Sequence, residues 1–297
     1  FNPWDNKISL REAVQYTTYQ GQGTNVTFDN SLFTNNQATI QLDSFYGEIQ
    51  NTSETLSIHG GENRNVTIDA HRPANVNYRI FSAYDTTKNW DIQFNNLTFT
   101  GVNAGEIDQN NINDKNGLGG AIFLYGNTST LALENVIVDS NTAYVAGGGI
   151  YTRGTNSNIT IDKTQFTNNT SPNGGAIYSD ASNISSIVVQ NSLLSNNSST
   201  SNGGAIYGNS TNTSKILVQS STFTNNTATG SGGAIYNKGL TNSTISLENT
   251  TIFSNTAKLN GGGIYQYSNG NNTIHVVDST IAGNKVLDNH GAGICQD

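Results

Sequence analysis

The sequence predicts an all-β protein, a right-handed single-stranded parallel β-helix (solenoid) that begins with a short capping helix. Three observations support this prediction. Short apolar segments recur with a period of about 28 to 30 residues, clusters of Gly, Asn and Ser separate them, and the repeats show no helical periodicity. Each repeat is therefore expected to form one coil of three short strands.

Three columns of residues define the repeat. The first is the motif Gly-Gly-Ala/Gly-Ile-aromatic, which ends in a variant copy at 291–295. The second is a pair of apolar residues two positions apart, and the third is an apolar residue three positions before an Asn. The isoleucines of the first column are Ile122, Ile150, Ile177, Ile206, Ile235, Ile264 and Ile294; the pairs begin at Leu131, Ile159, Ile187, Ile216, Ile245 and Ile274; the asparagines are Asn141, Asn169, Asn197, Asn226, Asn255 and Asn284. Columns that stay in step over six repeats exclude a coincidence of composition.

The length of the repeat favours a β-helix over other repeat folds. A propeller blade takes about 40 residues or more, and a leucine-rich repeat has its own leucine pattern. Stacked coils lie about 4.8 Å apart, so equivalent residues lie directly above one another. We expect the Ile and Val columns to point inward and the Asn column to join the coils through its amides. The paired glycines are expected to supply backbone geometries that a Cβ resists.

The first hundred residues keep the rhythm of strands and turns without a regular repeat. Strands are expected within 25–28, 39–42, 55–59, 65–69, 78–83 and 90–100. Ser9 and Glu12 form a predicted capping box for a helix through Val14, and this helix would cover the open first coil. The predicted parts are an N-terminal cap (1–24), irregular coils (25–104), a surface insertion (105–118) and regular repeats (119–297). No comparable cap follows Ile294, so that end is expected to be truncated or covered by something else.

The composition indicates a secreted or surface-displayed chain. Only 11% of residues are charged and the formal net charge is −8, which argues against binding nucleic acid. No segment approaches the roughly 20 apolar residues that span a bilayer, so no membrane insertion is expected. The chain opens at Phe1 without a signal peptide, as expected of a processed protein or a piece of a longer one. Cys295 is the single cysteine, which excludes an internal disulfide and makes an intermolecular one a hypothesis.

Triplets that could accept an N-glycan are abundant. A chain this rich in Asn, Ser and Thr also produces many such triplets by chance, so glycosylation stays open. The candidates are Asn25, Asn65, Asn96, Asn158, Asn183, Asn242 and Asn271.

The repeated GGAI and F-x-x-N motifs carry a resemblance that covers nearly the whole chain. They resemble the repeats of chlamydial polymorphic membrane proteins and of adhesin-like β-helix proteins of methanogenic archaea. The segment SLREAV at 9–14 is similar to the CSLREAI start of many bacterial and archaeal surface β-helices, and NVTIDAHR, IFSA and NNLTFTGVNA follow in the same order. Ile8 stands where that class usually has a Cys, which leaves Cys295 without a partner in the chain. The resemblance implies a surface protein, often an adhesin or envelope component, but no substrate.

The evidence in the sequence for catalysis is weak. A glycosidase needs two carboxylates about 5 to 9.5 Å apart, and Glu134 and Asp162 fall on neighbouring coils of one outward column. The alternative is that both are solvated turn residues. Arg153 and Asp180 are interpreted as an ion pair between coils. We therefore expect no enzyme and no cofactor, with a polysaccharide lyase or glycosidase as an alternative.

One segment has ligands that suit calcium. Glu106, Asp108 and Asp114 lie in the insertion before the first clear repeat and supply oxygen ligands for a hard cation. The segment lacks the spacing of an EF-hand, and a polar surface loop is the alternative.

The aromatic column that follows the core isoleucines is the most distinctive feature expected at the surface. Strand alternation sends the residue after an inward Ile outward, which predicts a strip that stacks on sugar rings or faces a neighbouring subunit. The alternatives are a ring stack that stabilises the coil or a column that faces inward. The strip consists of Phe123, Tyr151, Tyr178, Tyr207, Tyr236 and Tyr265.

Together these features predict a non-enzymatic structural or adhesive protein of an archaeal or bacterial cell surface. It is expected to self-assemble or to form part of a larger envelope or filament structure, with itself or other envelope proteins as partners. A carbohydrate-binding adhesin domain is the alternative that uses the aromatic strip.

Overall fold

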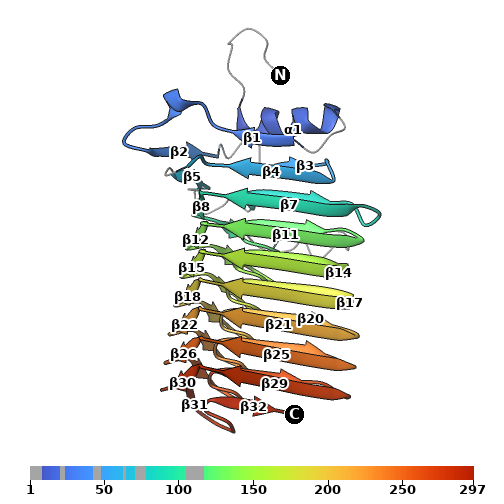
Figure 1. Ribbon diagram of the computed structural model, residues 1–297, viewed down its shortest axis with the longest axis vertical. Coiled ribbons are helices and arrows are strands. Elements are labelled where there is room, and N and C mark those ends of the chain that lie inside the picture. The colour runs from blue at the N-terminus through green and yellow to red at the C-terminus, as the bar shows by residue number, and fades with distance from the viewer. Residues whose placement is uncertain (1–8, 21–23, 43–47, 63–64, 71–77, 105–116) are drawn as a thin grey trace.

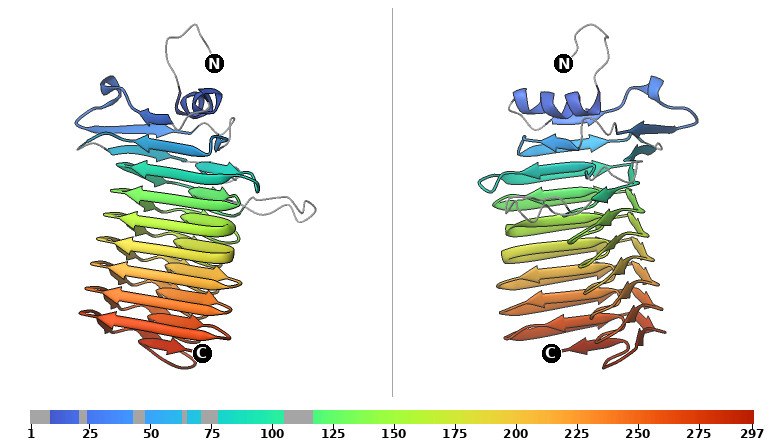
Figure 2. Two further views of the ribbon diagram at one scale, coloured as in Figure 1. Left: turned by 45° about the vertical axis from the view of Figure 1, so that its right-hand side comes forward. Right: turned by 180° about the vertical axis from the view of Figure 1, so that it is seen from behind.

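The computed structural model describes residues 9–20, 24–42, 48–62, 65–70, 78–104 and 117–297. The chain winds into a parallel β-solenoid, with α1 (Leu10–Gln20) at one end of the stack and β32 (Ile294–Gln296) at the other (Figure 1). Figure 2 shows the same stack from two further sides, with α1 lying across the first coil. The predicted fold class is confirmed.

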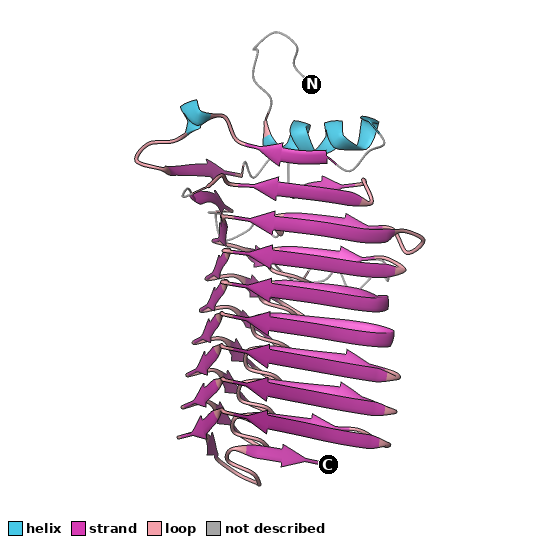
Figure 3. Cartoon of the chain, in the orientation of Figure 1, coloured by secondary structure: helices cyan, strands magenta, loops and turns pink. Residues whose placement is uncertain are grey.

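Three parallel sheets run along the stack, and Figure 3 shows that strands dominate every coil. The first sheet contains β1 (Thr24–Thr27), β3 (Ile49–Asn51), β4 (Thr55–His59), β6 (Phe81–Tyr84), β7 (Asn89–Asn95), β10 (Ile122–Tyr125), β11 (Thr128–Glu134), β14 (Ile150–Asp162), β17 (Ile177–Gln190), β20 (Ile206–Ser210), β21 (Thr213–Gln219), β24 (Ile235–Gly239), β25 (Asn242–Glu248), β28 (Ile264–Tyr267), β29 (Asn271–Val277) and β32. The second contains β2 (Gln37–Gln41), β5 (Asn65–Asp69), β8 (Leu97–Thr100), β12 (Ile137–Asp139), β15 (Gln165–Thr167), β18 (Leu193–Ser195), β22 (Thr222–Thr224), β26 (Thr251–Phe253) and β30 (Thr280–Ala282). The third contains β9 (Asn103–Ala104), β13 (Thr142–Ala143), β16 (Thr170–Ser171), β19 (Ser198–Ser199), β23 (Thr227–Ala228), β27 (Thr256–Ala257) and β31 (Lys285–Val286).

The register places equivalent residues of successive repeats opposite one another. Ile177 pairs with Ile206 in the first sheet, and Phe166 pairs with Leu194 in the second. The Ile and Val columns are buried and form one continuous core from α1 to the last coils. The predicted inward columns are therefore confirmed.

Besides the glycine that precedes each core strand, each coil from β8 onward has two bends that turn through a residue in the left-handed region of backbone conformation. Asn tolerates this conformation better than other residues with a Cβ, which explains its abundance at the bends. The first bend, between the first and second sheets, uses Asn96, Asn135, Lys163, Asn191, Ser220, Asn249 and Asp278; the second, after the short strand, uses Gly101, Ser140, Asn168, Asn196, Asn225, Ser254 and Gly283.

The two glycines of each pair serve different purposes. The first adopts a positive φ, as at Gly203 with a φ of 67°. The second lies against the next coil: a Cβ on Gly204 would come within 2.0 Å of the Gly233 carbonyl oxygen. The first glycine provides the turn and the second allows the coils to approach each other.

The buried asparagines form a continuous ladder of hydrogen bonds. Asn197 Nδ2 donates to the Phe166 carbonyl at 3.0 Å and to Asn226 Oδ1 at 3.0 Å. Asn197 Oδ1 accepts from the backbone N–H and the Nδ2 of Asn169, both at 3.0 Å. The predicted bonding between coils is confirmed, and each amide satisfies buried groups on both neighbouring coils.

The N-terminal helix begins with the predicted capping box. The Ser9 backbone N–H donates to Glu12 Oε2 at 2.9 Å, and the Glu12 N–H donates to Ser9 Oγ at 3.2 Å. Leu10 and Val14 are buried in the core that the coils share, so the helix covers the first coil. A single-turn 3-10 helix, η1 (Asn30–Leu32), follows β1. Among the described residues, no helix has the length and apolar character needed to cross a membrane.

Candidate functional site

The aromatic column forms a stack of rings along the first sheet. Consecutive ring centroids from Phe123 to Tyr265 lie 4.5 to 5.7 Å apart. The stack is separate from the main core, as strand alternation predicts. At its N-terminal end the Arg79 guanidinium lies 4.5 Å from the Phe123 ring centroid, and Arg79 Nε lies 2.9 Å from Glu48 Oε2.

The expectation that this column forms an exposed strip is wrong for four of its six rings. Phe123, Tyr151, Tyr207 and Tyr265 are 1%, 4%, 8% and 8% exposed. Tyr178 and Tyr236 are half-buried. Because these four rings are buried, their faces are closed to a sugar, and the geometry agrees with the alternative of a ring stack that stabilises the coil.

Burial also keeps the tyrosine hydroxyls protonated. Desolvation raises the pKa of Tyr151, Tyr178 and Tyr207 well above the usual value of 10.0, and nearby Asp180 raises all three further. Desolvation likewise raises the pKa of Tyr265, whose hydroxyl donates to Asp297 Oδ2 at 2.7 Å. These groups are therefore neutral structural elements at physiological pH.

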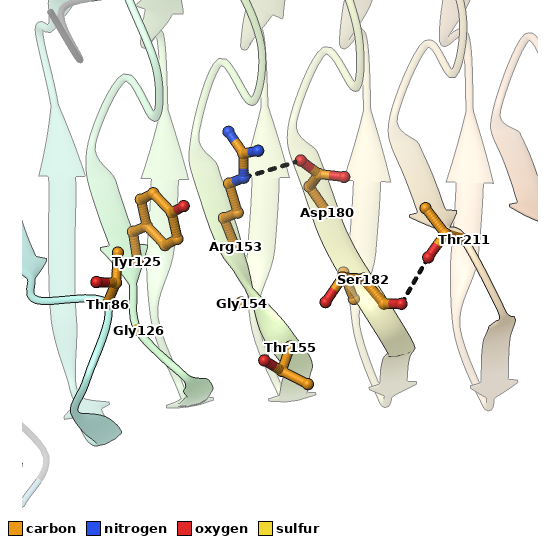
Figure 4. A pocket seen from close by; sticks show the side chains of 10 residues that line it. Thr86, Tyr125, Gly126, Arg153, Gly154, Thr155, Asp180, Ser182 and Thr211 are labelled. Carbon is orange, nitrogen blue, oxygen red and sulfur yellow. Dashed lines mark hydrogen bonds and ion pairs between the residues drawn. The ribbon is translucent and has the colours of Figure 1, made fainter. Parts of the chain in front are cut away.

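A groove opens beside the stack, over the column three positions after each core isoleucine. It has a volume of about 270 Å³, and Tyr125, Arg153 and Asp180 project into it from three successive strands (Figure 4). β6 pairs with β10, which places Tyr84 next to Tyr125. The full lining is Thr86, Tyr125, Gly126, Arg153, Gly154, Thr155, Asp180, Ala181, Ser182 and Thr211.

The side chains of the groove hold one another in place. Arg153 Nε lies 3.4 Å from Asp180 Oδ2, which confirms the expected ion pair between coils. Asp180 also accepts from Asn209 Nδ2 at 2.8 Å and from the Tyr151 hydroxyl at 3.3 Å. The Arg153 guanidinium lies 5.1 Å from the Tyr125 ring centroid. The groove therefore presents an aromatic face next to a neutralised ion pair.

The carboxylates considered for catalysis lie on the outer face of the first sheet. Glu134 and Asp162 are direct register partners, as the sequence predicts. Lys163 Nζ lies 3.6 Å from Glu134 Oε1 and 3.5 Å from Asp162 Oδ2. Glu134 is exposed and Asp162 is partly exposed, and because one lysine is shared by both carboxylates, the geometry supports the alternative of surface turn residues.

Further along the same face, the column continues as a chain of amides and a carboxylate. Gln190 Nε2 donates to Gln219 Oε1 at 2.7 Å, and Gln219 Nε2 donates to Glu248 Oε2 at 2.7 Å. Asp162 accepts from Asn191 Nδ2 at 2.7 Å. These groups are engaged with one another between coils.

The last coils expose residues that are buried in every earlier coil. The core column through Leu133, Ile161, Val189, Val218 and Leu247 is at most 2% exposed, whereas Val276 in the same column is 43% exposed. Ile274, Ile281 and Ile294 are only partly buried. These four residues line what we call the open edge.

The remaining predicted residues are accessible to different degrees. Cys295 is partly exposed, and burial together with Asp297 raises the pKa of its thiol, which disfavours the reactive thiolate. Every glycosylation candidate is exposed or half-exposed: Asn25, Asn65, Asn96, Asn158, Asn183, Asn242 and Asn271.

The calcium candidates Glu106, Asp108 and Asp114 lie outside the described residues. Within the described part of the chain, no three His, Cys, Asp or Glu side chains are grouped so that they could hold a metal ion.

Part of the repeat region matches a known family of repeats. Three segments, 163–180, 191–209 and 220–238, match the Chlamydia polymorphic membrane protein repeat. Each begins at the left-handed residue of the first bend (Lys163, Asn191 or Ser220) and ends at the outward column three positions after the core isoleucine. No curated protein and no solved structure matched the chain significantly.

Proposed function

From the polymorphic-membrane-protein repeats that the chain carries, we propose a non-enzymatic structural and adhesive role at a bacterial or archaeal cell surface. The protein acts as a rod of stacked coils. The observation that carries this proposal is the continuous set of columns, in which Ile, Asn and Tyr side chains are all engaged between coils. Such columns suit a stiff spacer whose stability accumulates coil by coil.

The polar surface supports this role over catalysis. The paired carboxylates Glu134 and Asp162 share Lys163, and the amides that follow them bond to one another. A general acid and a general base in a glycosidase must differ in protonation, whereas these two carboxylates have the same lysine as ion-pair partner.

We further propose that the open edge is a joint for self-association. Val276 is 43% exposed, whereas Leu247 at the same position of the preceding coil is 1% exposed. A further coil of the same repeat would cover Val276 and pair with the backbone of β29 and β30. α1 covers the first coil, so stacking of the open edge on that end is blocked. We propose that a second copy of the chain covers this edge, as a two-fold dimer that closes.

The oligomeric state tests this joint. Light scattering coupled to size-exclusion chromatography is expected to give twice the monomer mass of the chain. The Val276→Lys variant places a charge in the joint and is expected to elute as a monomer, because burying an unpaired ammonium is unfavourable. Thr244→Lys adds the same charge on the outer face of β25 and should leave the dimer intact. A wild-type monomer, or a Val276→Lys dimer, would contradict the proposal.

A further inference from the structure

We infer that the groove beside the tyrosine stack is a binding subsite for one ring of a neutral oligosaccharide. The inference deepens the adhesive part of the proposed function and rests on it. It transfers the expected sugar contact from the buried tyrosine stack to the next outward column, to Tyr125, which lines the groove, and to Tyr84, which packs against Tyr125 at the side of the groove.

The first argument is the aromatic surface. Tyr84 is 44% exposed and Tyr125 is half-exposed, and their ring centroids lie 5.3 Å apart at an interplanar angle of 67°. The two rings therefore form a corner rather than a closed stack. A pyranose ring has an apolar C–H face and a hydroxylated rim, which suits a tyrosine surface that is apolar on one side and wet on the other.

The second argument is the polar wall. Arg153 is 50% exposed and Asp180 is 22% exposed, so both reach the groove while they hold each other. A guanidinium supplies donors in a planar fork, and a carboxylate supplies acceptors, which together match vicinal hydroxyls. Asn209 and Tyr151 fix Asp180 from behind, so little ordering is needed on binding.

The charge of the wall selects the class of glycan. Arg153 is neutralised by Asp180, and the chain carries a formal net charge of −8. A uronate or sulfated sugar would meet the Asp180 carboxylate without an uncommitted cation in the wall. A neutral sugar has no charge for the Asp180 carboxylate to repel, so this arrangement does not weaken its binding.

The shape of the groove suits part of a longer chain. Its volume of about 270 Å³ lies below the roughly 300–1,000 Å³ typical of sites that enclose a drug-sized ligand. Its lining comes from successive coils between Thr86 and Thr211, so it runs along the axis of the rod (Figure 4). The groove therefore holds one ring while the rest of the glycan continues over the neighbouring coils.

The test is a binding screen with the full chain. The probes are immobilised neutral oligomers of glucose, mannose, galactose and N-acetylglucosamine, with uronate oligomers of equal length. At least one neutral oligomer is expected to bind, at least about tenfold more tightly than any uronate, with little change between about 0.1 M and about 1 M salt because the ligand is uncharged.

Variants connect the binding to the groove. Tyr125→Ala and Tyr84→Ala are each expected to weaken binding at least about tenfold. Tyr267→Ala removes a tyrosine of the same outward column outside the groove and should bind like the wild type. Thermal unfolding of each variant shows that it is folded, and Tyr84→Ala keeps the test decisive if Tyr125→Ala does not fold.

Three results would overturn the inference: no binding of any neutral oligomer, preference for uronates, or unchanged binding by the folded variants. Light scattering on the same samples separates this outcome from failure of the self-association joint. If the protein is a dimer that binds no glycan, the sugar subsite is wrong and the self-association joint stands. If the protein is a monomer that binds glycan, the joint is wrong and the subsite stands.

Discussion

The regular repeats after residue 118 and the irregular coils before residue 105 build the same solenoid by different means. In the regular part, the same side chains recur in successive coils, as in the columns that contain Ile206 and Asn197. In the irregular part, single large aromatic side chains fill the core. Phe94 packs edge-to-face against Phe81 at 5.0 Å and against Phe99 at 5.1 Å, and the fully buried Trp90 donates to the Tyr125 carbonyl at 2.9 Å.

This difference shows what determines the packing of the coils in each region. A column of identical residues fixes the register through repetition, so each coil depends mainly on its two neighbours. A cluster of unlike aromatic rings depends on the fit of each ring. The N-terminal region also anchors the tyrosine stack, since Arg79 faces the first ring and is paired with Glu48.

The largest expected effect is in the aromatic core. Phe94→Ala removes a ring that is 1% exposed and leaves a cavity that rigid neighbours cannot fill. We expect a loss of about 3–5 kcal/mol in the free energy of unfolding, measured by denaturant titration. Ile216→Val in a regular column is the comparison, with an expected loss of about 0.5–1.5 kcal/mol. Equal losses at the two sites would remove the distinction between the regions.

The asparagine ladder gives the next largest effect. Asn197→Leu leaves the Asn169 N–H, the Asn169 amide and the Phe166 carbonyl without their partner in a buried site. The loss is expected to be about 3 kcal/mol, because each unsatisfied buried group costs about 1–3 kcal/mol. Asn158→Ala on the outer face is the control, with a change within about 0.5 kcal/mol. A Leu variant as stable as the wild type would show that the ladder is dispensable.

The tyrosine stack predicts a specific sensitivity to alkali. The folded state holds the hydroxyl protons of Tyr151, Tyr178 and Tyr207 more tightly than the unfolded state, whose tyrosines titrate near 10. Their contribution to stability is therefore fully present below pH 10 and is lost as the pH rises above it. Replacement of these three tyrosines by Phe should flatten this decline, as followed by thermal unfolding from neutral to strongly alkaline pH. A decline of the same slope in the variant would assign it to other groups.

The smallest effect is expected at the helix cap. Ser9→Ala breaks the capping box and should cost about 1 kcal/mol. Because the helix touches only the first coils, faster amide hydrogen exchange should be confined to α1, β1 and β3. Faster exchange throughout the regular repeats would mean that the end cap controls the whole stack.

The sequence predicts the columns well because, in a parallel solenoid, residues one repeat apart lie next to each other on adjacent coils. The Ile column, the Asn ladder and the Arg153–Asp180 pair could all be placed from spacing alone. Exposure is harder to predict, since alternation gives the direction of Tyr207 but not the coverage that its neighbours provide. The pair of tyrosines beside the groove was missed because Tyr84 lies before the insertion, outside the regular period, and only the pairing of β6 with β10 brings it beside Tyr125.

Electron microscopy of the native protein at physiological salt tests the central claim most directly, namely that coils stack between molecules at the open edge. We predict straight rods of twice the length of one solenoid, with both ends formed by the helix-capped N-terminal coils. Single-length rods at the same concentration would contradict the joint. Long filaments would contradict the proposal that α1 blocks further stacking.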